Sequence, residues 1–183
     1  MILLRDPIKS FLNDGTGHFA DSGLALPVGL TVGVALGDVN NDGALDIVRA
    51  PSGGGADGVL INDGSGHFSP VQASFGASGG SGVSLADIDG NGTLDAILTN
   101  SVAEGGLQWW SNDGTGHFTF GATIDAALPP APPTLADFNG DGHVDIFYGG
   151  SEMRTLMNDG TGHFHEQVSS IAGVFNVDAG LLI

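Results

Sequence analysis

Short apolar runs alternate with acidic and glycine-rich segments along the whole chain. Residues 30–36 read Leu-Thr-Val-Gly-Val-Ala-Leu and lead into an acidic segment, and a further apolar run begins at Leu45. Runs of this length, rich in β-branched residues and bounded by Gly, Asn, Asp and Pro, are typical of β-strands. No helical period is sustained over a useful length. The pattern therefore predicts an all-β protein.

The same order of runs recurs three times. After each acidic segment comes a β-rich run, then a Gly/Ser-rich connection, then a third and a fourth strand. The second strands are predicted at 45–48, 94–98 and 144–148, the third at 59–61, 107–110 and 155–157, and the fourth from Phe68, Phe118 and Phe164. With the run before the acidic segment, each unit has four strands.

Two sequence markers share one period. The turn sequence Asn-Asp-Gly-[Thr/Ser]-Gly-His-Phe begins at Asn13, Asn62, Asn112 and Asn158, at intervals of 49, 50 and 46 residues. The acidic segment begins at Asp38, Asp87 and Asp137, at intervals of 49 and 50. A period of 46 to 50 residues with four strands per repeat is that of a β-propeller blade.

The repeats predict one β-propeller domain over residues 1–183, built from four-stranded antiparallel blades. The expected units are a half blade at 1–20, three blades at about 29–76, 77–127 and 128–166, and a half blade at 167–183, where the acidic segment has decayed near Asp178. The two halves could combine into a fourth blade and close a four-bladed ring. Alternatively, the chain is a fragment of a larger propeller or one partner in such an assembly. An open array would expose strand edges, which favour pairing with another chain.

The turn sequences are typical of β-hairpin turns, because Asn, Asp and Gly tolerate the positive φ of tight turns. Each turn carries a histidine: His18, His67, His117 and His163. A catalytic residue is needed once, whereas these histidines occur in every repeat, so we expect them to be structural.

The three acidic segments place oxygen-bearing side chains at positions 1, 3, 5 and 9, with glycine at position 6. Oxygens at this spacing converge as the loop curls, the carbonyl of position 7 turns inward, and Ca²⁺ prefers six to eight such ligands in flexible geometry. The predicted calcium ligands are Asp38, Asn40, Asp42, Ala44 and Asp46; Asp87, Asp89, Asn91, Thr93 and Asp95; and Asp137, Asn139, Asp141, His143 and Asp145. Arg49, Leu98 and Tyr148 stand where an EF-hand needs a bidentate Glu, which excludes that motif.

Charge and composition agree with cation binding. The chain carries 21 acidic and 4 basic residues, a net charge of −17, which three Ca²⁺ ions would reduce to −11. With so few basic residues, we expect neither nucleic acid nor an anionic membrane surface as a partner. There is no cysteine for a disulfide or a thiolate metal site, and no apolar run approaches the roughly 20 residues of a membrane span.

The three loops and the Asn-Asp-Gly-x-Gly-x-Phe turns resemble the FG-GAP/VCBS repeat family, which includes the calcium-binding blades of integrin α-subunits, many bacterial surface proteins and some fungal lectins. The resemblance covers nearly the whole chain and implies that each calcium loop joins the first and second strands of its blade. The Gly-Ala-Pro element of the family is reduced to residues 49–51 in one unit. Since family members usually have more blades, the larger-ring interpretation is favoured.

These features predict a non-enzymatic, calcium-binding module that acts as an extracellular or cell-surface scaffold or adhesion domain, in a secreted and bacterial setting. Residues 1–7 are too short an apolar stretch for a signal peptide. The alternative is a lectin in which Trp109, Trp110 and Tyr148 stack on sugar rings, although packing between blades is the more frequent role of such rings. Because neighbouring strand residues face opposite ways, only one tryptophan is expected in the core. An enzyme, or the accessory domain of a polysaccharide-degrading enzyme, is less favoured, since no catalytic constellation is present. Self-association to complete a ring is a further expectation.

Overall fold

The computed structural model describes residues 11–23, 31–51, 58–72, 80–100, 106–126, 132–149 and 153–167. Every regular element within these ranges is a β-strand, so the all-β prediction is confirmed. The same ranges contain no helix with the length and hydrophobicity needed to span a bilayer.

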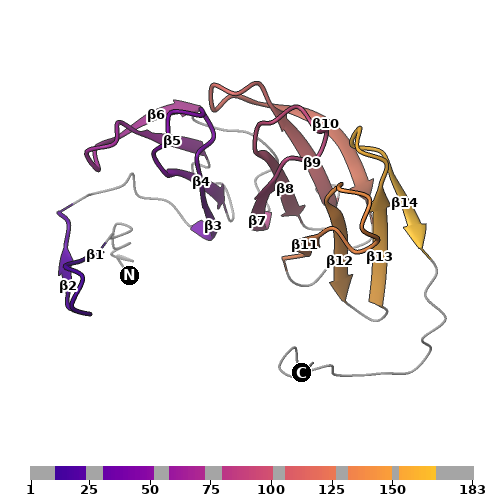
Figure 1. Ribbon diagram of the computed structural model, residues 1–183, viewed down its shortest axis with the longest axis horizontal. Helices are drawn as coiled ribbons and strands as arrows, with labels where there is room; N and C mark the ends of the chain where they lie inside the picture. The colour runs from indigo at the N-terminus through magenta and orange to yellow at the C-terminus, as the bar shows by residue number, and fades with distance from the viewer. Residues whose placement is uncertain are drawn as a thin grey trace, which may run out of the picture.

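The strands form three four-stranded sheets and one hairpin (Figure 1). The hairpin joins β1 (Phe11–Asn13) and β2 (Phe19–Asp21). The first sheet holds β3 (Thr31–Gly37), β4 (Asp46–Pro51), β5 (Gly58–Asn62) and β6 (Phe68–Gln72); the second holds β7 (Gly80–Ala86), β8 (Asp95–Asn100), β9 (Leu107–Asn112) and β10 (Phe118–Asp125); the third holds β11 (Thr134–Ala136), β12 (Asp145–Gly149), β13 (Met153–Asn158) and β14 (Phe164–Gln167). We call these sheets blades 1, 2 and 3.

Each blade is an antiparallel meander in which sequential strands are neighbours. In blade 1, β3 pairs with β4, β4 with β5 and β5 with β6, and the other two blades repeat this order. The acidic loops lie between β3 and β4, β7 and β8, and β11 and β12. Each loop therefore joins the first and second strands of its blade, as the family resemblance implies.

The core is sandwiched between successive blades. One apolar cluster joins blades 1 and 2 and is built from Val39, Val48, Ala50, Val59, Val83, Ala96, Leu98 and Phe118. A second cluster joins blades 2 and 3 and is built from Ile88, Ile97, Leu107, Ile146, Tyr148 and Leu156. Blade 2 thus buries one face against blade 1 and the other against blade 3.

The two tryptophans of β9 illustrate this two-sided packing. Trp110 is half-buried against the cluster between blades 1 and 2, and Trp109 is half-buried against the cluster between blades 2 and 3. They do face opposite ways. The expectation that only one of them belongs to the core was wrong, because the middle blade has an apolar neighbour on each face.

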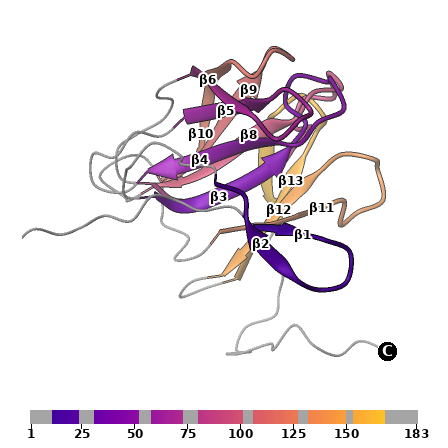
Figure 2. The ribbon, with the colours of Figure 1, turned by 90° about the vertical axis from the view of Figure 1, so that its left-hand side faces the viewer.

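The blades fan out in an arc and are not closed into a ring, so the four-bladed closure is not seen among the described residues (Figures 1 and 2). The hairpin β1–β2 has the strands expected of the first half blade and forms a two-stranded sheet of its own. The decayed loop near Asp178, and the half blade to which it was assigned, lie outside the described residues.

Candidate metal centre

The acidic loops of blades 1, 2 and 3, called loops 1, 2 and 3, follow the same backbone path. Their position-6 glycines, Gly43, Gly92 and Gly142, have φ values of +90°, +83° and +90°. This left-handed conformation costs an L-residue free energy that glycine avoids, which explains glycine at this position in every copy. The sharp bend turns positions 1 to 5 back toward one another.

The carboxylate at position 1 holds this bend. Oxygen Oδ2 of Asp38 accepts the N–H of Gly43 at 2.8 Å, and the same bond is made at 3.0 Å by Asp87 and at 2.9 Å by Asp137 with their own position-6 glycines. In loop 2, Oδ1 of Asp87 also accepts the N–H groups of Gly90 and Asn91. The first predicted ligand of each loop is therefore pre-positioned by main-chain donors.

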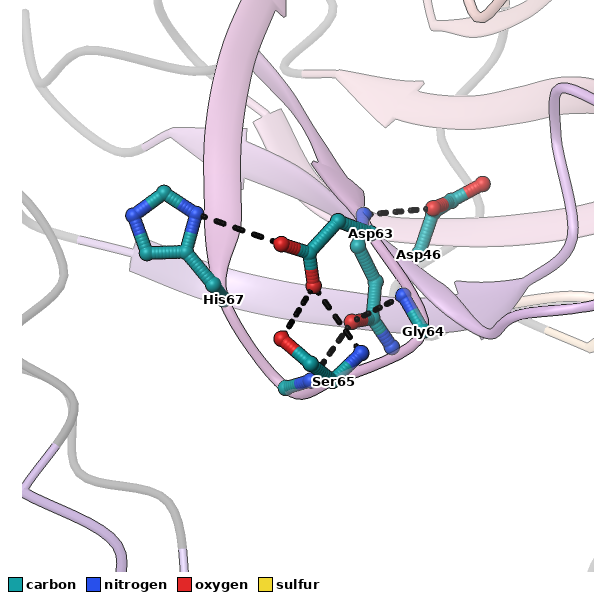
Figure 3. Close-up of polar contacts among 7 residues, drawn as sticks. Asp46, Asp63, Gly64, Ser65 and His67 are labelled. Carbon is teal, nitrogen blue, oxygen red and sulfur yellow. Dashed lines mark hydrogen bonds and ion pairs between the residues drawn. The ribbon is translucent and has the colours of Figure 1, made fainter.

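The carboxylates at position 9, namely Asp46, Asp95 and Asp145, are fully buried, each with 0% exposure. In each, Oδ2 accepts the N–H of the loop's second residue, at 2.9, 3.1 and 2.9 Å. In each, Oδ1 accepts the N–H of the asparagine that opens the following turn, at 2.8, 2.9 and 2.9 Å. Figure 3 shows Asp46 in this bond beside the turn that contains Asp63 and His67. A single buried residue thus ties the acidic loop to the hairpin turn of its blade.

Loop 2 brings its three carboxylates together. One oxygen from each of Asp87, Asp89 and Asp95 lies within 4.8 Å of the others, an arrangement that could hold a metal ion. Burial raises the pKa of Asp95, and the neighbouring charge of Asp89 adds to this shift, although hydrogen bonds from Asn112, Ile88 and Trp109 oppose it. A cation bound among these oxygens would stabilise the ionised form of Asp95 against both effects.

Loops 1 and 3 are arranged differently because they have asparagine at position 3. The side-chain amide of Asn40 donates to Asp42 at 2.7 Å, and that of Asn139 donates to Asp141 at 2.8 Å. Loop 2 has Asp89 at position 3, and a carboxylate has no N–H group to donate to the residue at position 5. Within the parts of the chain that the structure describes, loop 2 is accordingly the one loop whose acidic oxygens meet at this distance.

Position 7 is fixed through its N–H group. The main-chain N–H groups of Ala44 and His143 donate to the Asp at position 5 of their loops, both at 2.8 Å. The N–H group of Thr93 donates to Asn91 at 2.7 Å. The hydroxyl of Thr93 also reaches the carbonyl of Asn112 at 2.9 Å. All fifteen predicted ligand positions therefore lie in or directly after the three loops, and those of loop 2 are the most closely joined to their blade.

The asparagine of the Asn-Asp-Gly turn has a role that its turn propensity does not reveal. The side-chain amide of Asn112 donates to the carbonyl of Leu94 in its own blade and to that of Val39 in blade 1. Asn158 repeats both bonds, to Val144 and to Ile88 of blade 2. The signal available in the sequence was that this asparagine never varies to the equally turn-compatible Asp or Gly among the four turns.

The turn histidines lie at the surface beside the turn aspartates. Nδ1 of His18 lies 3.7 Å from Asp14, and Nδ1 of His67 lies 3.8 Å from Asp63, which also accepts the hydroxyl of Ser65 (Figure 3). At the other two turns, Nδ1 of His117 and of His163 lies 3.1 and 2.8 Å from the hydroxyl of the turn threonine. Contacts within each separate turn fit a structural role for these histidines.

The remaining predicted ligand-binding aromatic, Tyr148, is buried with 6% exposure. Its hydroxyl donates to Asp125, which also binds Arg154 at 3.1 Å. Burial, followed by the bond to Asp125, raises the pKa of Tyr148 to about 12. The ring belongs to the contact between blades 2 and 3, as does that of Trp109.

The comparison with family models agrees with this geometry. A model described as an FG-GAP-like repeat matches residues 38–98 and 96–148, each match running from one blade into the next. Together the matches cover more than half of the chain. The comparison with curated proteins found no match. The chain belongs to the FG-GAP-like repeat family.

Proposed function

We propose that this protein is a calcium-binding, non-catalytic β-propeller repeat module in which three Ca²⁺ ions, one in each acidic loop, brace the blades. FG-GAP repeats are in general non-catalytic and often bind Ca²⁺. The observation that carries the proposal is the recurring position-9 aspartate, which has 0% exposure in all three loops and the same two main-chain donors in each.

A bound ion would compensate a cost built into each loop. A buried carboxylate is unfavourable unless it is hydrogen-bonded or paired with a cation, and two further carboxylates stand in the same loop. In loop 2 the three lie close enough to share one ion. In loops 1 and 3, rotation of the amides of Asn40 and Asn139 would present their oxygens in place of the N–H groups that now bind Asp42 and Asp141.

The donor set favours Ca²⁺ over Mg²⁺. Carboxylate, amide and main-chain oxygens in a flexible loop suit six to eight long bonds, whereas Mg²⁺ demands a strict octahedron. Calcium loops of extracellular modules bind at about 10⁻⁴ to 10⁻³ M, which matches calcium outside cells. We therefore propose an extracellular or cell-surface scaffold or adhesion role.

The test is calorimetric titration of metal-free protein together with thermal unfolding. We expect three Ca²⁺ per chain. At 1 mM Ca²⁺ and a Kd of about 10⁻⁴ M, each occupied site adds about 1.4 kcal/mol to the free energy of unfolding. The midpoint should fall by several degrees in EGTA and recover with Ca²⁺ but poorly with Mg²⁺. An unchanged midpoint in chelator would contradict the proposal.

A further inference from the structure

Successive blades dock through the same bond at both internal interfaces. The side-chain amide of Asn112 donates to the carbonyl of Val39 at 2.8 Å, and that of Asn158 donates to the carbonyl of Ile88 at 2.8 Å. Each acceptor is the second residue of the preceding blade's acidic loop. The Asn-Asp-Gly turns of blades 2 and 3 are therefore each bonded to the acidic loop of the preceding blade.

The second glycine of the turn allows this close approach. A Cβ atom on Gly116 would lie 2.9 Å from the side chain of Ile61 in blade 1, and one on Gly162 would lie 2.5 Å from the ring of Trp109 in blade 2. At the hairpin β1–β2, the equivalent Gly17 has nothing within 4 Å. The hairpin has the same turn sequence, but no described residue lies against the corresponding surface of its turn.

Blades 1 and 2 share a second polar contact. The side chain of Gln72 in β6 accepts the N–H of Phe118 at 2.7 Å and donates to its carbonyl at 2.9 Å. Gln72 stands opposite Val59 in the register, and Gln167 of β14 stands opposite Thr155, the equivalent position of blade 3. Gln167 is exposed. Blade 3 therefore offers an amide where blade 1 uses one to hold the following blade.

The same face of blade 3 also carries apolar surface that no described residue of a further blade covers. Phe138, the second residue of loop 3, is 46% exposed, whereas its counterparts Val39 and Ile88 are 0% and 1% exposed. The ring of Phe138 packs edge-on against that of Phe147, with centroids 6.1 Å apart. We call Phe138, Phe147 and Gln167 the open face of blade 3.

The hairpin β1–β2 has the complementary surface. Its apolar residues Phe11, Leu12 and Phe19 are 56%, 65% and 60% exposed. At equivalent positions in complete blades the residues are less exposed: Leu60 and Phe118 are 2% exposed, and Trp110, Phe68 and Phe164 are half-buried. An isolated two-stranded hairpin is only marginally stable in water, so these residues require a partner.

We propose that the hairpin β1–β2 of one copy docks on the open face of blade 3 of a second copy of this chain. The side-chain amide of Asn13 then binds the carbonyl of Phe138, and the main chain of Phe19 binds the amide of Gln167. Nine residues separate β2 from β3 and reach about 30 Å at most, which keeps the hairpin near blade 1. The open face belongs to the opposite end of the arc (Figure 1). Two copies that exchange hairpins form a closed dimer, and the inference does not depend on bound calcium.

Cysteine crosslinking separates exchange between copies from closure within one chain, because the natural sequence has no cysteine. Phe19→Cys and Gln167→Cys variants, each alone, are mixed under mild oxidation. We expect a covalent dimer in the mixture at several times the yield of either variant alone. A Phe19→Cys, Gln167→Cys double variant that crosslinks only as a monomer would overturn the proposal in favour of closure within one chain.

Solution mass measured by light scattering over a range of concentrations tests the interface itself. The native chain should be dimeric, and Asn13→Ala or Phe138→Asp should each raise the concentration of half-dimerisation about tenfold or more. Val71→Asp, on an exposed apolar residue of β6 outside the open face, is the matched control and should leave it unchanged. A monomer at every concentration, or a dimer indifferent to both variants, overturns the proposal. Calcium titration of the same samples reports separately on the proposed function.

Discussion

The side-chain amide of Asn112 lies 2.8 Å from the main-chain carbonyl oxygen of Val39, in the preceding blade and 73 residues earlier in the chain. Both residues are buried, with exposures of 1% and 0%. Asn158 and Ile88 repeat the relationship across the next interface. In an array where each unit contacts only its neighbours, such bonds set how strongly the unfolding of one blade is coupled to the next.

Replacement of Asn112 by Ala should lower the free energy of unfolding by about 2–4 kcal/mol. The change removes the donor to the buried carbonyl of Val39 and to the partly buried carbonyl of Leu94, and an unsatisfied buried group costs roughly 1–3 kcal/mol. Urea denaturation of metal-free protein measures the difference. Asn62→Ala is the matched control, since Asn62 donates to Leu45 within its own blade at 3.1 Å and should cost about 1 kcal/mol. Equal losses in the two variants would contradict an inter-blade role.

Gly162→Ala should destabilise the protein more than Gly66→Ala. Both glycines have positive φ, +79° and +86°, so both variants incur the left-handed cost of about 1–2 kcal/mol. Only at Gly162 would the new methyl group meet a neighbour, the ring of Trp109 at 2.5 Å, whereas Gly66 has nothing within 4 Å. Overpacking should add about 1–3 kcal/mol.

Thermal and urea unfolding of the two glycine variants provide the measurement, and the difference between them isolates the blade contact. A Gly162→Ala variant no less stable than Gly66→Ala would show that the turn does not press on the preceding blade. Tryptophan fluorescence of the same samples, to which Trp109 and Trp110 both contribute, reports whether the surroundings of these rings have changed.

The strands, the turns and the loop bends were predictable because each depends on residues close in sequence. Alternation of apolar runs located the strands, and the position-6 glycines located the bends. The bond from Asn112 to Val39 was not predictable, because it joins parts of the chain that meet only once both blades have formed. For the same reason the sequence did not reveal that both Trp109 and Trp110 would be packed. The difference between the loops was also missed: Asn40 binds Asp42 in loop 1, whereas Asp89 lies close to the other two carboxylates of loop 2.

Acidification should weaken the hairpin turns. The pKa values of the turn aspartates Asp14, Asp63, Asp113 and Asp159 are all lowered, chiefly by the hydroxyl of the Thr or Ser two residues later. A carboxyl whose folded pKa lies below its unfolded value of about 3.9 stabilises the fold above that value. This stability is lost as the pH falls through the folded pKa. Unfolding in urea between pH 7 and pH 2, with EGTA present, should therefore show a decline below about pH 4.

Thr115→Ala isolates one turn, because it removes the hydroxyl bond to Asp113 and leaves the main-chain bond in place. The pKa of Asp113 should rise toward its ordinary value, as measured by NMR titration, and the acid decline should become shallower. Thr119→Ala, at an exposed strand position, is the control. Asp95 acts with the opposite sign, since its pKa is raised, so the comparison between variants is more informative than the overall profile. An unshifted Asp113 would contradict the assignment.

Loss of one loop carboxylate should remove one calcium ion without unfolding the protein. Asp89 is the best position for this change in loop 2, because it is only half-buried, whereas Asp95 is fully buried and accepts three hydrogen bonds. Asp89→Ala should reduce the calorimetric stoichiometry from three Ca²⁺ to two. It should also lower the gain in unfolding free energy at 1 mM Ca²⁺ by about 1.4 kcal/mol, the share of one site with a Kd of about 10⁻⁴ M.

The control for this change is Ser111→Ala. The hydroxyl of Ser111 donates to Asp89 at 3.3 Å, so its removal takes away the same hydrogen bond and keeps the carboxylate. If the charge and oxygen of Asp89 bind calcium, Ser111→Ala retains three ions and Asp89→Ala does not. If both variants lose the same ion, the hydrogen bond to β9 organises the loop and Asp89 need not be a ligand. If neither variant loses an ion, Asp89 is not a calcium ligand.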